Sequence, residues 1–97
     1  MRINEFEKNI IIEAIKETDP KAKVWLFGSR VDDSKKGGDI DIAILSTLIS
    51  DDIMKEILIR RHICDRIGEQ KIDIVISGNG EDTFFKYATE KGILLNG

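Results

Sequence analysis

The sequence predicts an α+β domain of two layers, in which a small mixed β-sheet packs against helices. Two observations carry this prediction. Three short runs of β-favouring residues, at 24–27, 39–45 and 72–76, have the length and composition of strands. Segments with apolar residues at helical spacing precede, separate and follow these runs, which gives the order helix, strand, strand, helix, strand, helix.

The first helix is predicted over residues 4–18. Asn4, with Glu7 three residues later, resembles a capping box at its start. The apolar positions at helical spacing are Phe6, Ile10, Ile11, Ala14 and Ile15. The helix is expected to end before Pro20, because proline cannot continue the hydrogen-bond ladder and biases the preceding residue away from helix.

The first strand, residues 24–27, is wholly apolar and is followed by the turn formers Gly28 and Ser29. Residues 31–38 are polar and end in glycine, which predicts a loop or a short helical turn. The second strand follows at residues 39–45.

A long helix is predicted after the second strand. Either Ser50 or Asp51 can cap its start, and Gly68 is a natural terminator just after Ile67. Its buried side is expected to carry Ile53, Ile57, Cys64 and Ile67.

The third strand is predicted at residues 72–76 and the last helix at 82–92, joined by a turn at 77–80. An apolar tail, residues 93–95, ends the pattern. Three strands are few, so we expect a partner surface to cover part of the sheet or this tail.

Composition favours one folded domain over residues 1–97, since 41% of the residues are apolar and 34% are charged. The net charge of -3 argues against broad binding of nucleic acid through its phosphates, but it is compatible with a small anionic ligand held through a metal. Cys64, the one cysteine, cannot form an internal disulfide, and no apolar run approaches the roughly 20 residues of a membrane span. Because residues 1–5 also lack a signal-peptide pattern, we expect a cytoplasmic protein with no membrane contact.

Two aspartates, Asp39 and Asp41, interrupt an apolar strand, where aspartate is uncommon and like charges repel. Side chains alternate along a strand, so both carboxylates point to one face while isoleucines anchor the other. Two such carboxylates can converge on one divalent ion or on a pair of ions. Magnesium suits them because it takes its other ligands from water and substrate phosphates. Asp73 interrupts the third strand in the same way, so strand pairing can bring three acids together as a metal and base cluster.

The turn at Gly28 and Ser29 supplies features of a phosphate site. Glycine lets the backbone approach a phosphate closely, and the serine hydroxyl can donate to a phosphate oxygen. Arg30 adds a cation, whose role in binding phosphate, a partner or a neighbouring carboxylate stays open.

The spacing of these motifs resembles the DNA polymerase β-type nucleotidyltransferase superfamily. The residues that carry the resemblance are Phe27, Gly28 and Ser29, then after nine residues Asp39, Ile40, Asp41 and Ile42, and later Asp73. The short length, the Gly-Ser-Arg stretch and the closing segment at 84–95 resemble its minimal nucleotidyltransferase branch. Members of that branch often pair with HEPN-domain proteins as antitoxins.

The resemblance implies a role for each matched residue. Gly28 and Ser29 would contact the phosphates of the nucleotide. Asp39 and Asp41 would hold two magnesium ions, and Asp73, the third carboxylate of the metal site, would help activate the attacking hydroxyl. ATP would be the donor and a hydroxyl of a HEPN partner, such as a tyrosine, the acceptor of AMP, with this chain as the antitoxin. Assembly as a hetero-oligomer or as a homodimer stays open.

Two other readings compete with this one. The chain can instead be a non-catalytic binding module that neutralises or scaffolds a partner by direct contact, which its small size and apolar tail fit. A haloacid-dehalogenase-like phosphatase is a weaker match, because Ala43 stands where those enzymes need threonine or valine. Read singly, the aspartates could be the wet face of a strand and Gly28-Ser29 only a turn, but their joint spacing argues against this.

The remaining residues that attract attention have structural interpretations. The aromatic residues are scattered along the chain, so Trp25 is expected in the core or an interface, and no base-reading pocket is visible. His62 is expected at a surface or half-buried position, with no second histidine to build a zinc site with Cys64.

Overall fold

The computed structural model describes residues 3–31, 39–68 and 70–96. The α-helices are α1 (Glu5–Thr18), α2 (Thr47–Ser50), α3 (Ile53–Ile67) and α4 (Thr83–Lys91), and η1 (Gly28–Val31) is a 3-10 turn. The strands are β1 (Lys23–Phe27), β2 (Ile40–Leu45), β3 (Ile72–Ser77) and β4 (Ile93–Leu94). Apart from Val31, the predicted loop at 31–38 lies outside the described residues.

The strands form one mixed sheet in the order β3-β2-β1-β4. β1 runs antiparallel to both β2 and β4, whereas β2 and β3 are parallel. A parallel pair needs a crossover connection, and α2 and α3 form it between the end of β2 and the start of β3. The α+β class predicted from the sequence is confirmed.

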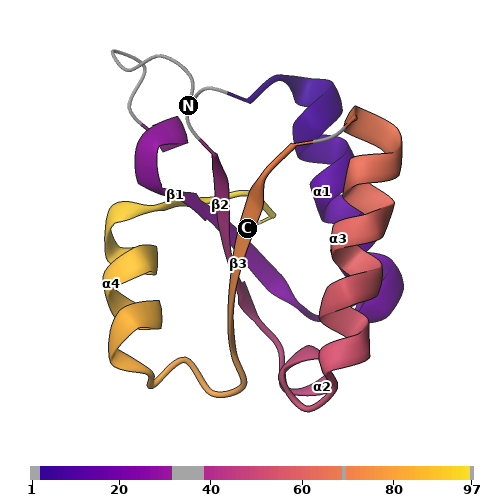
Figure 1. Cartoon of the computed structure of the whole chain (residues 1–97). Helices are drawn as coiled ribbons and strands as arrows, with labels where there is room; N and C mark the ends of the chain where they lie inside the picture. The colour runs from indigo at the N-terminus through magenta and orange to yellow at the C-terminus, as the bar shows by residue number, and fades with distance from the viewer. Residues whose placement is uncertain (1–2, 32–38, 69, 97) are drawn as a thin grey trace.

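Helices cover both faces of the sheet (Figure 1): α1 and α3 lie together on one face, and α4 lies on the other. The main core lies under α1 and α3, and its fully buried side chains include Ile11, Ile15, Leu26, Ile42, Ile44, Ile59 and Ile63. Burying each of these contributes about 1.5–3 kcal/mol. A smaller cluster lies under α4 and comprises Ala43, Phe85 and Ala88, with Trp25, Phe27, Leu45 and Val75 packed against it. The helix α4 therefore adds a layer to the two that the sequence predicted.

The start and end of α1 follow the sequence closely. The capping box is present: the Asn4 side chain accepts from the Glu7 backbone N–H (2.7 Å), and the Asn4 N–H donates to the Glu7 carboxylate (2.9 Å). The helix ends at Thr18, two residues before Pro20. Phe6 is 53% exposed, so the buried face of α1 begins one turn later, at Ile10.

The long helix predicted after β2 is present as α3, which ends at Ile67 with Gly68 as its C-cap. A short helix that was not predicted, α2, precedes it and is capped by Ser46, whose hydroxyl accepts from the Ile49 N–H at 3.0 Å. The cap of α3 is Asp52, which accepts from the Met54 N–H at 3.0 Å, and not the predicted Ser50 or Asp51. Strong capping residues at Ser46 and Asp52 thus start the short helix α2 and the predicted helix α3 separately.

The buried side of α3 also differs from the prediction. Ile53 and Ile57 are 74% and 48% exposed, while Ile59 and Ile63 are buried. Residues two apart on an α-helix point about 200° apart, so Ile57 and Ile59 cannot both face the core. Cys64 and Ile67 do pack against the core, as predicted.

The apolar tail is part of the sheet. Ile93 and Leu94 pair with Leu26 and Trp25 as β4, and Leu95 is buried at 5% exposure. The side chain of Asn96 continues this pairing, because it accepts from the Val24 N–H and donates to the Ala22 carbonyl, both at 2.9 Å. The expectation that this tail needs a partner surface is therefore wrong.

Candidate active site

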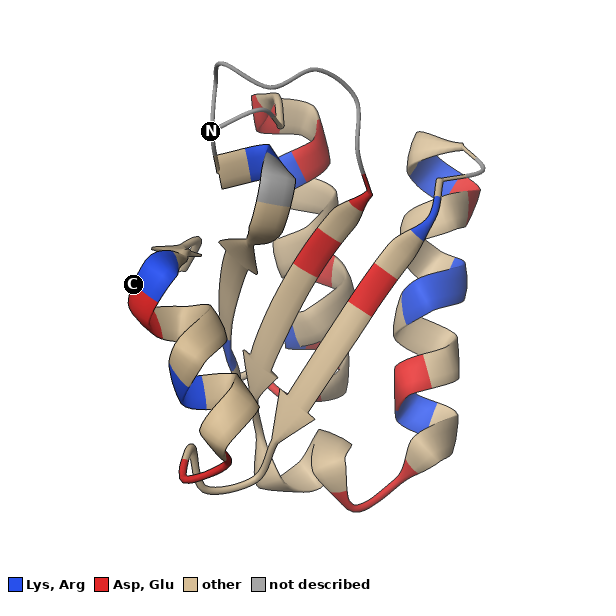
Figure 2. Ribbon diagram, turned by 60° about the vertical axis from the view of Figure 1, so that its left-hand side comes forward, with Lys and Arg blue, Asp and Glu red and all other residues tan. Residues whose placement is uncertain are grey.

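Two of the predicted acids, Asp41 of β2 and Asp73 of β3, lie directly beside each other. They are register partners in the parallel pair β2–β3, and a hydrogen bond links their carboxyl groups. Figure 2 shows acidic positions side by side on these strands, with another at the start of β2. They share the face of the sheet that carries Ala43 and Val75, but Asp73 remains exposed and Asp41 half-buried.

The electrostatics of this pair differ from those of ordinary surface carboxylates. Burial raises the pKa of Asp41 to about 6, and the hydrogen bond and negative charge of Asp73 act in the same direction, with a further contribution from Asp39. Lys71 opposes the shift. Asp41 therefore takes up a proton at a higher pH than an ordinary surface aspartate does.

The third predicted acid, Asp39, immediately precedes β2. Its carboxylate forms an ion pair with Lys71 at 3.5 Å, in which the lysine side chain is 71% exposed and the Asp39 side chain 42% exposed. The sequence analysis missed Lys71, although a signal for it exists: residues 39–42 read Asp-Ile-Asp-Ile and residues 71–74 read Lys-Ile-Asp-Ile. The parallel register aligns these two stretches, so the lysine sits at the position opposite Asp39.

The turn after β1 brings its backbone against the acids. Gly28 has φ +75°, and a Cβ at this position would overlap the carboxylate of Asp41. Only glycine satisfies both conditions, because other residues rarely adopt this conformation and would displace the acid. Ser29 follows in η1, but its side chain lies outside what the structure describes; Arg30, also in η1, is half-buried. The predicted phosphate turn and the predicted acids are therefore neighbours in space.

The donor set suits a hard divalent cation. Among the described residues, no group of three or more His, Cys, Asp and Glu side chains is arranged to hold a metal ion. The pair Asp41 and Asp73 nevertheless fits such an ion, because a cation would relieve the repulsion that raises the pKa of Asp41. Asp39 lies on the same side of β2 and would have to exchange Lys71 for the metal.

A cavity of about 630 Å³ adjoins this site, between η1 and α4. Its walls include Phe27 and Gly28 on one side and Phe84, Tyr87 and Lys91 on the other. Phe27 is the register partner of Asp41, so the cavity and the acids share one face of neighbouring strands. The cavity could not be predicted from the sequence pattern, since its aromatic residues come from positions nearly sixty residues apart.

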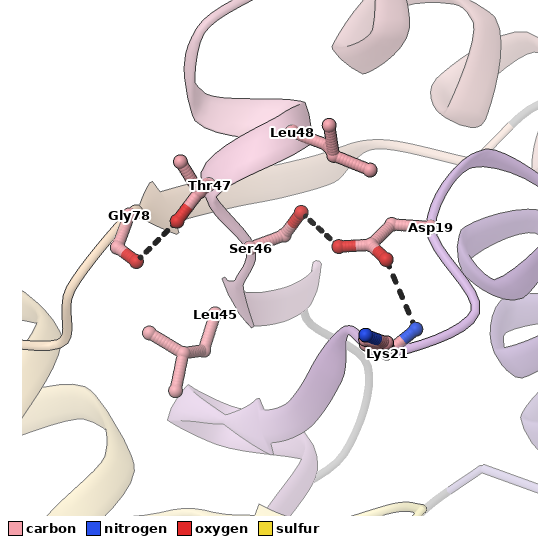
Figure 3. Close-up of a pocket in the computed structure, with 7 residues that line it drawn as sticks. All are labelled: Asp19, Lys21, Leu45, Ser46, Thr47, Leu48 and Gly78. Atoms are coloured by element: carbon pink, nitrogen blue, oxygen red, sulfur yellow. Dashed lines mark hydrogen bonds between the residues drawn. The ribbon is translucent and has the colours of Figure 1, made fainter.

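A second cavity, of about 420 Å³, lies at the opposite end of β2 (Figure 3). The polar groups at its wall bind one another: the Ser46 hydroxyl donates to Asp19 at 2.6 Å, and the Thr47 hydroxyl donates to the Gly78 carbonyl at 3.1 Å. These hydrogen bonds join the end of α1 to the start of α2 and to the loop after β3. The polar groups of this cavity therefore have a structural role, because they bind one another and hold these segments together.

Two other residues take structural roles. His62 contacts Glu17 at 3.2 Å and links α3 to α1, in the half-buried position predicted for it. Trp25 packs edge to face against Phe85, with ring centroids 5.5 Å apart, in the cluster under α4.

One comparison with known proteins found a match. The family model described as Polymerase beta, Nucleotidyltransferase matches residues 9–97, which include both acidic strands and the Gly28 turn. A search among curated proteins found none that matches the chain. No helix in the described ranges is both long enough and apolar enough to cross a membrane.

Proposed function

The chain belongs to the polymerase β nucleotidyltransferase family, and from this premise we propose that it transfers AMP from ATP to a hydroxyl group of a partner protein. The observation that most supports the proposal is the pairing of Asp41 with Asp73 beside the Gly28 turn. In the proposal the partner is a HEPN-type toxin, and this chain is its cytoplasmic antitoxin.

Each acid has a distinct part in the proposed reaction. Asp39 and Asp41 would hold magnesium ions, with Asp73 as the third carboxylate of the site. Bound magnesium supplies positive charge that offsets the charge on the triphosphate and on the departing pyrophosphate. Lys71, which neutralises Asp39 in the absence of a ligand, is a positioning residue for that carboxylate.

The chemical step needs a base, and Asp73 is the exposed member of the acidic pair. The acceptor hydroxyl loses its proton to Asp73 as its oxygen forms a bond to the α-phosphorus. The bond between that phosphorus and the oxygen bridging to the β-phosphate breaks, and pyrophosphate leaves. The acceptor then carries a nucleoside monophosphate as a phosphodiester.

The turn after β1 binds the phosphates in this proposal. Gly28 lets the backbone come close to Asp41, so a triphosphate lying against the turn reaches the acids with its α-phosphate. Ser29 and Arg30, which follow directly in η1, contribute a hydroxyl and a guanidinium group to phosphate binding.

The test is the intact mass of the protein and of whatever co-purifies with it from its native cells, after incubation with magnesium and each nucleoside triphosphate in turn. We expect the partner to gain whole units of AMP with ATP, and to gain none with Asp41→Asn. The exposed Asp65→Asn on α3 serves as a matched control that keeps the activity. Transfer that persists undiminished in Asp41→Asn would refute the role of this acid.

The alternative, a binding module without catalysis, is favoured by a different observation. The apolar side chains Ile53, Met54, Ile57 and Leu58 on α3 are each about half to three quarters exposed, which suits contact with another protein. Under this alternative, the double variant Asp39→Asn and Asp41→Asn binds and neutralises the partner as well as the natural protein does, and no mass changes.

A further inference from the structure

We propose that the cavity between η1 and α4 is the binding pocket for the base of the donor nucleotide. This inference rests on the proposed transferase function and names the part of the site that holds the nucleoside. It also assigns a role to Phe84 and Tyr87, two aromatic side chains that the sequence pattern left without one.

The shape of the cavity is the first argument. Its volume of about 630 Å³ lies within the range of about 300–1,000 Å³ that is typical of small-molecule sites. One wall is Gly28, whose backbone lies against the Asp41 carboxylate. A ligand whose phosphates lie at this turn therefore has the cavity directly beside it.

The rings that line the cavity are the second argument. Phe84 and Tyr87, three residues apart on α4, are nearly parallel, with centroids 6.4 Å apart and an interplanar angle of 16°. Phe27 meets Phe84 edge to face at 6.1 Å. Stacking on such rings suits any nucleobase because every base has a π-face.

Exposure is the third argument. Phe84 and Tyr87 are 56% and 60% exposed, whereas Phe85, between them in sequence, is buried at 4% under the helix. The helix α4 therefore keeps one aromatic residue in the core and presents two to the cavity. Exposed rings of this kind are accessible to a planar ligand that enters the cavity.

The distribution of charged side chains around the cavity assigns the base and the phosphates of the ligand to different places. Among the described residues, Lys91 at the end of α4 is the charged side chain that lines the cavity, while the acids lie beyond Gly28. The ammonium group of Lys91 can donate to an acceptor atom of the base or ribose. The apolar walls suit the base, and the acidic strands suit the metal-bound phosphates, so the ligand has one orientation.

The experiment compares two ligands that differ in the presence of a base. We would measure the affinity of the full chain, with magnesium, for 2-aminopurine riboside triphosphate and for inorganic triphosphate. The fluorescence of 2-aminopurine, which stacking quenches, reports directly on contact with the rings. The variants are Phe84→Ala and Tyr87→Ala, and the control is Phe6→Ala on α1, which removes an equally exposed phenylalanine far from the cavity.

We expect each cavity variant to weaken binding of the nucleotide by about tenfold, which is the scale of one stacking contact, and to reduce the quenching. Affinity for inorganic triphosphate should not change, and Phe6→Ala should resemble the natural protein. Nucleotide affinity and quenching that survive in the double variant Phe84→Ala and Tyr87→Ala would overturn the base pocket while leaving the proposed transferase intact. If the natural protein bound neither ligand, the proposed function would fail, and this inference with it.

Discussion

An aspartate lies beside each end of β2, and the two aspartates are in opposite electrostatic states: Asp41 is in β2 near its start, and Asp19, which caps the end of α1, contacts Ser46 just after the strand. At one end, Asp19 is buried at 7% exposure, and hydrogen bonds from the Ser46 hydroxyl and the Lys21 N–H hold its pKa below the usual value. At the other end, burial and the adjacent carboxyl of Asp73 raise the pKa of Asp41 to about 6. The fold stabilises the charge of the first aspartate and opposes the charge of the second.

This difference distinguishes a carboxylate with a structural role from the carboxylate that we propose for the active site. Asp19 has its donors within the chain, so nothing further is needed to satisfy it. Asp41 faces another acid across neighbouring strands, an arrangement that costs stability unless a cation joins it. Strongly perturbed carboxyl groups beside a cavity are typical of sites that bind a charged ligand or catalyse a reaction.

The largest expected effect comes from removing the charge of Asp41. Asp41→Asn should reduce nucleotide transfer by at least about a hundredfold, since even outer groups around a metal site contribute 10- to 100-fold. Its unfolding free energy should stay the same or rise, because the amide can donate to Asp73 where two carboxyl groups repelled. The transfer rate and the unfolding free energy in urea are measured on one preparation of the variant. A lower unfolding free energy than that of the natural protein would contradict the view that the charge of Asp41 costs stability.

A change at Gly28 should damage both the fold and the site. Gly28→Ala adds strain of about 1–3 kcal/mol at a positive φ and pushes the Asp41 carboxylate aside, so stability and transfer should both fall. Gly80→Ala is the matched control, because Gly80 has a similar φ of +80° and leaves ordinary van der Waals space for a Cβ. Equal transfer rates in the two variants would show that the contact with Asp41 is unimportant.

A smaller effect, confined to stability, is expected at the structural end. Ser46→Ala removes the hydroxyl that caps α2 and donates to buried Asp19, and should lower the unfolding free energy by about 1–3 kcal/mol. Transfer activity should not change at temperatures well below unfolding. Ser50→Ala, which removes an exposed hydroxyl bound only to the Thr47 carbonyl, should cost much less in thermal denaturation.

The smallest effect is the dependence of stability on pH, which should have opposite signs at the two ends. The folded pKa of Asp19 is depressed, so its contribution is present above the ordinary value of 3.8 and is lost as the pH falls through the folded pKa. The folded pKa of Asp41 is raised, so its contribution to stability falls as the pH rises from about 4 to about 6. Denaturation in a chelating buffer should therefore show Asp41→Asn gaining stability relative to the natural protein across that interval. A constant difference between the two would exclude the raised pKa.

Much of the fold could be predicted from local sequence. Apolar periodicity and capping signals predict the start and end of α1, the strands β1 to β3 and the helix α4. The buried face of α3 could not be predicted, because isoleucine occurs on several sides of that helix and only contact with the sheet selects Ile59 and Ile63. The strand at 93–94 was missed because two residues carry no periodic signal of their own.

The candidate site was predicted in part. The period of two along β2 placed Asp39 and Asp41 on one face, and the matching pattern in the third strand pointed to Asp73. Lys71 and the lining of the cavity were missed, because both depend on which residues the strand register and the packing of α4 bring together.

The amino-acid sequence by itself determined the fold class, the family and the positions of the acids, because alternation along a strand and conformational limits at glycine and proline act between near neighbours in the chain. The tertiary structure alone decided that Asp41 pairs with Asp73, that Asp39 pairs with Lys71, and that Phe27 meets Phe84 beside Gly28. Each of these contacts joins segments at least thirty residues apart. The strand register and the packing of α4 on the sheet bring these segments together, and neither depends on near neighbours in the chain.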